Sequence, residues 1–296
     1  MTILTCEATA QEEDYNAFDI MLDRGSMLRK LRELEVEDEK LRQAASLEEE
    51  EFDEDEESGN KDTLLYDTYL RRQKCYDDFK HVNYRYLDFG NVGTDGKLLI
   101  EQDRGISKMS KGGQVWDAGV ILAEHIIHEQ AEWKKLQSKS PVKMVELGAG
   151  TGITGLYVAK VMKDDVHVAI TDLPELVPLM EKNIQHNQLA SNVTAFPLAW
   201  GSNVADNYDV ILGADVVAGI YCPKKLAQTI CDLCHENTIV YMTVNCRLTE
   251  IIDTFESAMT ELFENFEKRA PVSRNKNPTV SILVASRKRW QIIIGR

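Results

Sequence analysis

The chain has 296 residues, enough for one large domain with an extension or for two modest domains. Its formal net charge of −15 is concentrated at one end, because residues 1–60 hold 20 of the 49 acidic residues and 6 of the 34 basic ones. The near-neutral remainder argues against tight nucleic-acid binding, the six cysteines do not form a disulfide framework in a chain this long, and no apolar run could span a membrane. We therefore expect a cytoplasmic protein, also present in the nucleus, that does not associate with membranes.

Residues 1–60 are predicted to form an acidic, largely disordered arm. Glu48 to Glu57 is nearly unbroken acid, which repels itself and buries little apolar surface. Ahead of it, Met27 to Ala45 carries leucines between charged residues and indicates a short amphipathic helix. We interpret the arm as a solvated tail, with attraction of a basic partner as the alternative.

The next predicted elements lead into the folded part. A helix is expected over residues 61–80, and two strand-like segments follow at Tyr84–Phe89 and Lys97–Gln102. The stretch between these segments is rich in Gly, Asn and Asp, which predicts a hairpin. A glycine loop then passes through Trp116 into an apolar helix. Trp116 is well placed to cover a cofactor bound by the following motif, although packing in the core is the commoner fate of a tryptophan.

An apolar run at Val142–Leu147 is followed by a glycine cluster and a helical pattern that begins near Ile153. Strand, tight turn and helix form the opening unit of a doubly wound α/β sheet, in which the ligand lies beyond the carboxyl end of the strand. Gly148, Gly150 and Gly152 lack a Cβ, so the backbone can turn sharply and approach a ligand closely. The N–H groups at the start of the helix suit an anionic group. The sequence therefore predicts a nucleotide-like cofactor at this turn.

Two cofactors compete for this site. The run from Gly150 to Gly155, with Thr151 inside it, fits the G-x-G-x-x-G pattern of dinucleotide binding, and Asp172 follows about twenty residues later. Glu146, however, comes directly before the glycines, where it would repel the pyrophosphate of NAD. A sulfonium cofactor carries an α-amino group and a cationic sulfur, which a carboxylate favours. We therefore prefer S-adenosylmethionine to NAD.

Further strands are predicted at His167–Thr171, Val193–Leu198, Tyr208–Leu212 and Thr238–Val244, with helices between them. Asp172, with Leu173 beside it, ends the first and is expected to accept hydrogen bonds from ribose hydroxyls. Trp200 follows the second, where packing in the core is one interpretation. Segments Phe266–Ala270 and Thr279–Ser286 would pair as a final antiparallel hairpin, which distinguishes a methyltransferase sheet from a dehydrogenase sheet.

The hairpin, the segment Gly-Gln-Val-Trp-Asp-Ala at 113–118 and Val-Glu-Leu-Gly-Ala-Gly-Thr-Gly at 145–152 resemble lysine methyltransferase family 16, of the methyltransferase-like 21 type. The resemblance covers about residues 82–288 and leaves the acidic arm unmatched. It implies a Rossmann-like seven-stranded α/β sheet with helices on both faces. It also implies S-adenosylmethionine as cofactor, with Trp116 against it and Trp200 stacked on its adenine. The methyl acceptor that it implies is a lysine of a chaperone or translation factor.

The end of the Tyr208–Leu212 strand bears on the substrate. This family has Asp-x-x-Tyr there, whereas here Asp215 is followed by Tyr221 only after three additional residues. The Asn/Asp-Pro-Pro-aromatic tetrad of enzymes that methylate bases or glutamine is absent, which argues against those substrates. We interpret Asp215 as the acceptor that holds and orients the lysine amine, Tyr221 as an aromatic wall of its channel, and Ala214 as part of the cofactor site.

The sequence thus predicts a methyltransferase domain over residues 61–296, with the hairpin and helices in 61–140 and the Rossmann-like core in 141–296. A protein-lysine methyltransferase is the preferred function. A methyltransferase for a small molecule or RNA, and a non-catalytic cofactor-binding protein whose arm binds the partner, are the alternatives. A monomer is expected.

No metal site is expected. Cys231 and Cys234 have C-x-x-C spacing, but they lie in a predicted helix over Pro223–Cys234 and lack a second pair of ligands. We interpret them as buried or half-buried thiols.

Overall fold

The structure is a computed structural model. It describes residues 84–88, 97–103, 105–106, 112–135, 141–202, 206–218, 221–245, 249–274 and 277–289. The expected acidic arm, the expected helix over 61–80 and the connection inside the hairpin lie outside the described residues.

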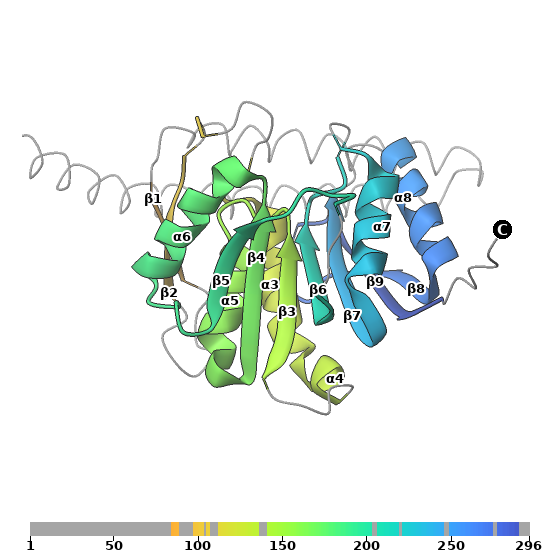
Figure 1. The fold of residues 1–296 in the computed structure, drawn as a ribbon, viewed down its shortest axis with the longest axis horizontal. Helices are drawn as coiled ribbons and strands as arrows, with labels where there is room; N and C mark the ends of the chain where they lie inside the picture. Colours follow the sequence, from red (N-terminus) through yellow and green to blue (C-terminus); the bar gives the residue numbers. More distant parts are fainter. Residues whose placement is uncertain are drawn as a thin grey trace, which may run out of the picture.

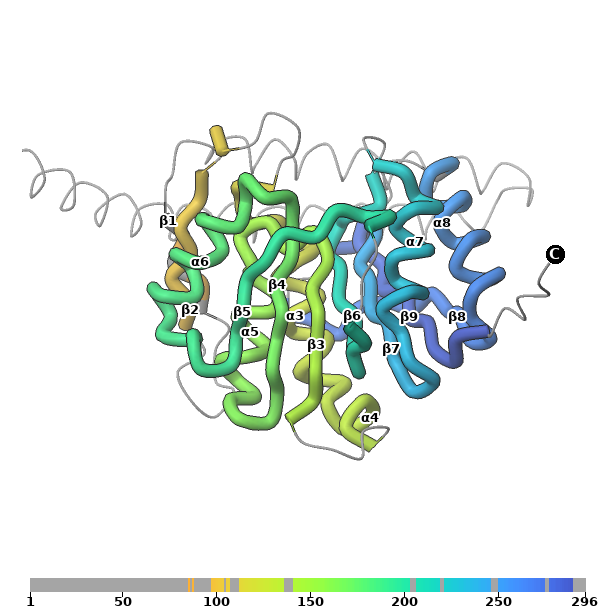
Figure 2. Tube along the Cα trace, viewed as in Figure 1, coloured from red at the N-terminus to blue at the C-terminus, as the bar shows by residue number. Residues whose placement is uncertain are grey.

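Two strands near the start of the described chain form the predicted hairpin. Strands β1 (Tyr84–Asp88) and β2 (Lys97–Glu101) pair antiparallel as a separate two-stranded sheet. The hairpin lies alongside helix α6 (Val177–His186), at the end of the main sheet where β5 (Val193–Pro197) forms the edge (Figure 2). It therefore extends the molecule on the side of the sheet edge formed by β5.

The core is a seven-stranded sheet with the order β5-β4-β3-β6-β7-β9-β8 (Figure 1). Besides β5, its strands are β3 (Val142–Leu147), β4 (Val166–Asp172), β6 (Tyr208–Ala214), β7 (Cys234–Asn245), β8 (Phe263–Arg269) and β9 (Val280–Lys288). Strands β3 to β7 run parallel, and β9 pairs antiparallel with both β7 and β8. The predicted seven-stranded sheet and its final antiparallel pair are confirmed. The strand order reverses between β3 and β6, where doubly wound sheets bind their ligands.

Helices cover both faces of this sheet (Figure 1). Besides α6, they are α3 (Asp117–His128), α4 (Gln130–Lys135), α5 (Ile153–Met162), α7 (Pro223–Asp232) and α8 (Thr249–Leu262). Short 3-10 turns at Lys163–Asp165 and Pro174–Leu176 precede β4 and α6. Figure 1 shows α3 and α5 behind the sheet and α7 and α8 in front of it.

Two apolar clusters, one on each face, hold these layers together. Successive strand residues alternate between them, as a pleated strand requires. Met144 belongs to the cluster that includes residues of α3, α5 and α6, and Val145 belongs to the cluster that includes residues of α7 and α8. The same alternation occurs at Tyr241 and Met242 on β7. Continuous apolar runs therefore read as strands covered on both sides.

One predicted boundary is wrong. The helix expected over Pro223–Cys234 ends at Asp232, and Cys234 is already the first residue of β7, paired with Tyr208 on β6. The sheet pairing overrides the helical pattern at that point. Cys231 and Cys234 are buried free thiols, which agrees with our interpretation of them. No group of three or more metal-ligating side chains occurs among the described residues.

None of the described helices combines the length and the apolar character needed to cross a bilayer.

Candidate functional site

The parallel strands bring the predicted site residues to one edge of the sheet. Their arrowheads point the same way in Figure 1, so the segments that follow them meet there. The glycine turn at 148–152 follows β3, Asp172 ends β4, Trp200 follows β5 and Asp215 follows β6. This is the carboxyl-end crevice at the reversal point of the sheet, where a ligand is expected.

The glycine turn is close-packed. Gly148, Gly150 and Gly152 all have positive φ, at 62°, 58° and 81°. A Cβ on Gly150 would lie 2.5 Å from the carbonyl oxygen of Gly112, in the loop before Trp116. That distance is too short for any side chain, so glycine is required there both by φ and by space. The loop ahead of α3 therefore lies directly against the turn.

Asp172 fixes the same turn from the end of β4. Its Oδ2 accepts a hydrogen bond from Gly150 N at 2.8 Å, and its Oδ1 accepts one from Leu173 N at 2.7 Å. Burial raises the pKa of this carboxyl group, with a smaller contribution in the same direction from Glu175, and the two backbone hydrogen bonds oppose the rise. Leu173 beside it is half-buried. A contact of Asp172 with ribose stays a prediction.

Glu146 lies beneath the first turn of α5. Its side chain is 1% exposed, and its Oε2 accepts a hydrogen bond from Gly155 N at 2.8 Å. Burial raises the pKa of Glu146 to about 7, against hydrogen bonds from Gly155 and Thr154 that lower it, while the Asp172 charge adds to the rise. The carboxylate thus satisfies a free N–H at the helix start. Its predicted contact with a cofactor amine stays a prediction.

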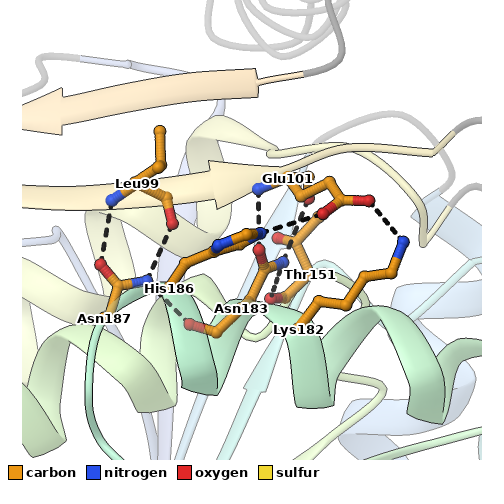
Figure 3. A network of polar contacts seen from close by, with 7 residues as sticks. All are labelled: Leu99, Glu101, Thr151, Lys182, Asn183, His186 and Asn187. Atoms are coloured by element: carbon orange, nitrogen blue, oxygen red, sulfur yellow. Dashed lines mark hydrogen bonds and ion pairs between the residues drawn. The ribbon is translucent and has the colours of Figure 1, made fainter. Parts of the chain in front are cut away.

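Thr151 connects the glycine turn to helix α6. Its hydroxyl oxygen is buried and has no hydrogen-bond partner in the described part of the chain, whereas its carbonyl oxygen accepts from Asn183 Nδ2 at 3.0 Å. The same Asn183 amide pairs with the backbone of Glu101 on β2: Oδ1 accepts from Glu101 N at 2.7 Å, and Nδ2 donates to Glu101 O at 3.1 Å. One buried side chain therefore links α6, the hairpin and the turn (Figure 3).

A second asparagine repeats this pairing one helical turn later. Asn187 accepts from Leu99 N at 3.0 Å and donates to Leu99 O at 2.8 Å. The two amides meet alternate residues of β2 as a neighbouring strand would (Figure 3). Glu101 adds an ion pair with Lys182 at 2.7 Å and a contact between its Oε2 and His186 Nε2 at 3.0 Å. Sequence reasoning missed this attachment, whose only signal is two asparagines four residues apart on a helix.

Trp200 and Tyr221 form an aromatic pair on the other side of the turn. Their ring centroids are 5.0 Å apart and the planes are inclined by 68°. Trp200 Cζ2 lies 3.4 Å from the position that a Cβ on Gly148 would occupy, so the indole covers the turn. Both side chains are half-buried. The structure thus brings together two aromatic residues that the sequence nominated separately.

Asp215 follows β6 in a conformation unusual for a residue with a side chain. Its φ is 55°, and its N–H is within hydrogen-bonding distance of both the carbonyl oxygen (3.1 Å) and the hydroxyl oxygen (3.2 Å) of Thr243 on β7. Aspartate tolerates this left-handed region better than most residues, and such outliers cluster at functional sites. The bend in the chain after β6 is therefore anchored to the neighbouring strand at the residue predicted to hold the substrate.

Trp116 and Ala214 both lie next to the start of helix α3. Trp116 is half-buried and directly precedes the helix, and its carbonyl oxygen accepts from Gly119 N at 3.1 Å. The Ala214 Cβ lies 3.9 Å from the position of a Cβ on Gly119, so α3 packs against the end of β6. Asp117 accepts a hydrogen bond from Asn277 Nδ2 at 3.1 Å, which ties this helix start to the β8–β9 connection.

Two further amides at the site were not singled out by sequence reasoning. Gln114 lies in the loop over the glycine turn, and Asn245 ends β7. Gln114 Nε2 and Asn245 Oδ1 are buried atoms without a hydrogen-bond partner among the described residues. Neither the hydrophobic periodicity nor the charge pattern of a sequence singles out an uncharged amide. The only sequence signal for Asn245 is a polar residue that ends an otherwise apolar run.

The chain is similar to a family of known proteins. Residues 94–268 match the family model described as lysine methyltransferase. A protein-lysine N-methyltransferase of Saccharomyces cerevisiae is 33% identical over 180 residues, which cover 53% of this chain and 70% of that protein. The EEF1A lysine methyltransferase 3 of Xenopus tropicalis is 30% identical over 200 residues, covering 66% and 82%. A protein N-lysine methyltransferase of Danio rerio is 33% identical over 179 residues, covering 57% and 74%.

Proposed function

Because the chain belongs to the lysine methyltransferase family, we propose that it transfers a methyl group from S-adenosylmethionine to a lysine side chain of a protein. The observation that carries the proposal is the position of Asp215. It follows β6, across the reversal point of the sheet from the glycine turn after β3. A carboxylate that can hold an amine thus stands beside the segment that can hold a nucleoside cofactor.

The glycine turn fits a cofactor with a nucleoside and an amino-acid tail. Gly148 and Gly150 let the turn pack against Val216 and Gly112, where a Cβ would clash, and Thr151 offers a buried hydroxyl group that has no partner in the described part of the structure. When bound, S-adenosylmethionine supplies a methyl group that is already activated by its cationic sulfur. The residues that we propose to hold it are Trp116, Glu146, Gly148, Gly150, Thr151, Gly152, Asp172, Leu173, Trp200 and Ala214.

The other end of the site presents acceptors, which suit an amine. Lysine has an unperturbed pKa of about 10.4, so its ammonium must lose a proton before its nitrogen can act as a nucleophile. Asp215 and Asn245 each lie within two residues of the Ala214–Thr243 pair that joins β6 to β7. We propose that Asp215 holds and orients the amine, and that Tyr221 with Trp200 forms an aromatic wall of its channel.

We also propose a target class, an oligomeric state and a location in the cell. The Xenopus tropicalis relative is named for EEF1A, and family resemblance implies translation factors or chaperones, so we propose such a protein as the target. We further propose a monomer that acts in the cytoplasm and the nucleus. The near-neutral charge of residues 61–296 supports the absence of tight nucleic-acid binding.

The test is transfer of labelled methyl groups into a lysate from cells that lack this protein. We expect the wild type to label a discrete protein band. Asp215→Asn is the informative variant, because asparagine also tolerates positive φ and keeps the shape of the side chain. Labelling should fall about tenfold to a hundredfold, the value of a hydrogen bond to a charged group.

Two outcomes contradict the proposal. If the purified protein binds S-adenosylmethionine but labels no macromolecule, the small-molecule and non-catalytic alternatives take its place. If it binds no cofactor, the assignment of the glycine turn fails, and the proposed reaction fails with it.

A further inference from the structure

Two polar groups beside the glycine turn are buried without a hydrogen-bond partner among the described residues: Gln114 Nε2 and the hydroxyl oxygen of Thr151. Gln114 is 8% exposed and Thr151 is 1% exposed, so neither group is exposed enough to be well hydrated. Buried polar groups are nearly always paired in native proteins. An amide N–H and a hydroxyl O–H that both lack a partner indicate a ligand group with oxygens to accept from them.

The two residues belong to segments that lie against each other. Gly112, two positions before Gln114, places its carbonyl oxygen so close to Gly150 that a Cβ there would be 2.5 Å from it. Thr151 is the residue that follows Gly150. The loop carrying Gln114 therefore lies over the same turn that carries the Thr151 hydroxyl group.

Both segments are held in place independently of any ligand. On one side of Gln114, Asp103 N donates to Gly113 O at 2.8 Å, and on the other side Val115 N donates to Gln102 Oε1 at 2.9 Å. The position of Thr151 is fixed by the hydrogen bond from Asn183 to its carbonyl oxygen. A ligand would thus meet two donors that need little rearrangement, which favours affinity.

The charge at this point suits an anion. Thr151 lies two residues before the first residue of α5, a helix of ten residues, and the N-terminal end of a helix carries partial positive charge. The two acidic groups beside the turn are both engaged by backbone N–H groups, since Glu146 Oε2 accepts from Gly155 N and Asp172 Oδ2 accepts from Gly150 N. Neutral donors at a positive helix end favour a carboxylate over an amine.

We propose that Gln114 and Thr151 bind the α-carboxylate of the amino-acid tail of the cofactor. This inference deepens the proposed function, because it assigns residues to one group of S-adenosylmethionine and leaves the nucleoside to Asp172 and Trp200. Hydrogen bonds from neutral donors to a carboxylate are charge-assisted and stronger than neutral pairs. Gln114 thus becomes a specificity-determining residue that distinguishes the complete cofactor from nucleosides without the tail.

The test compares two ligands that differ in that tail. S-adenosylhomocysteine carries the α-carboxylate, whereas 5′-deoxy-5′-methylthioadenosine keeps the nucleoside and a thioether but lacks the amino-acid group. Isothermal titration calorimetry gives the Kd of each ligand for the full chain. We expect Gln114→Glu, which places a carboxylate where the amide donor was, to weaken S-adenosylhomocysteine at least about tenfold, or about 1.4 kcal/mol. The Kd of methylthioadenosine should stay within about twofold of wild type.

Thr151→Val is a second, independent variant that keeps the shape of the side chain and removes the hydroxyl group. It should raise the Kd of S-adenosylhomocysteine several-fold and leave the Kd of methylthioadenosine unchanged. Gln185→Glu makes the same chemical change at an exposed position of α6 and should change neither Kd. Thermal unfolding of each variant shows that the fold is retained, and Gln114→Met replaces Gln114→Glu if the buried charge prevents folding.

The proposal is overturned if the variants weaken both ligands equally, since the two residues would then support the turn and not the carboxylate. It is also overturned if neither variant changes the preference for S-adenosylhomocysteine. Failure of the proposed function looks different, because the wild type would then bind neither ligand. If the wild type binds both ligands and the variants keep the same preference, this inference fails while the proposed function stands.

Discussion

The ring of Trp200 meets the ring of Tyr221 edge to face, with centroids 5.0 Å apart. Tyr221 is the residue that the altered Asp-x-x-Tyr spacing left uncertain, since three additional residues separate it from Asp215. Its N–H donates to the carbonyl oxygen of Ala218 at 3.0 Å, so Tyr221 lies close to the position that the family spacing would assign to the tyrosine. The aromatic ring thereby returns to the edge of the sheet where the glycine turn lies.

This contact predicts different effects for two substitutions of Tyr221. Tyr221→Ala removes the aromatic pair, so we expect the free energy of unfolding to fall by about 1 kcal/mol. We also expect methyl transfer to protein to slow about two- to fivefold, the value of an exposed cation–π contact. Tyr221→Phe keeps the ring and should retain more stability in urea unfolding and more labelled-methyl transfer than Tyr221→Ala. Equal losses in the two variants would show that the hydroxyl group, and not the ring, matters.

Gly150 is expected to tolerate no side chain. Gly150→Ala combines a positive φ with a Cβ at 2.5 Å from the carbonyl oxygen of Gly112. We expect a loss of about 2 kcal/mol or more in the free energy of unfolding, with loss of S-adenosylhomocysteine binding by calorimetry. Gly105→Ala is the matched control, since among the described residues the nearest atom to its Cβ would be Asp103 Oδ1 at 3.4 Å. Gly150→Ala with wild-type stability would contradict the close packing of the loop on the turn.

Asn183 on α6 and Asn187, the residue that follows the helix, offer a matched pair of variants. Asn183→Ala leaves the Glu101 backbone and the Thr151 carbonyl oxygen without their partner, whereas Asn187→Ala does the same to Leu99 and leaves the turn untouched. Each should lower the free energy of unfolding by about 1–3 kcal/mol. Only Asn183→Ala should also lower the affinity for S-adenosylhomocysteine, which calorimetry measures. Equal affinity in the two variants would mean that the hairpin does not support the cofactor site.

Glu146 predicts a pH dependence of stability. Burial raises its pKa from 4.5 to about 7, so the folded state binds more protons than the unfolded state between these values. The group therefore makes the free energy of unfolding fall as pH rises through that window. Glu146→Gln does not titrate, so the variant should gain stability relative to wild type from pH 4.5 to 7 and then remain at a constant difference. Urea unfolding of both proteins without cofactor measures this difference, and a pH-independent difference would refute the prediction.

The sequence predicted the parts of the fold that depend on local pattern. The strand at 142–147, the glycine turn and the helix after it follow from apolar runs and from glycines that no other residue can replace. The hairpin follows from two strand-like segments around turn residues. The boundary at Cys234 was wrong because pairing with Tyr208 on β6, a contact distant in sequence, decides where the helix ends.

The candidate site was predictable only in part, for a related reason. Asp172, Trp200 and Asp215 could be nominated because each follows a recognisable strand. Gln114 and Asn245 could not, since the meaning of an amide depends on whether it is buried and what surrounds it. The bond from Glu146 to Gly155 was missed because an acid beside glycines reads equally as a ligand contact or as support for a helix.

The hairpin is attached to the body of the protein through side chains instead of a shared backbone ladder (Figure 3). A backbone ladder is nearly indifferent to sequence, because almost every residue supplies the same two groups. Here the hydrogen bonds to the backbone of β2 come from two side chains, those of Asn183 and Asn187. A single substitution at either asparagine can therefore change how strongly the hairpin is held against α6, while the seven-stranded sheet stays the same.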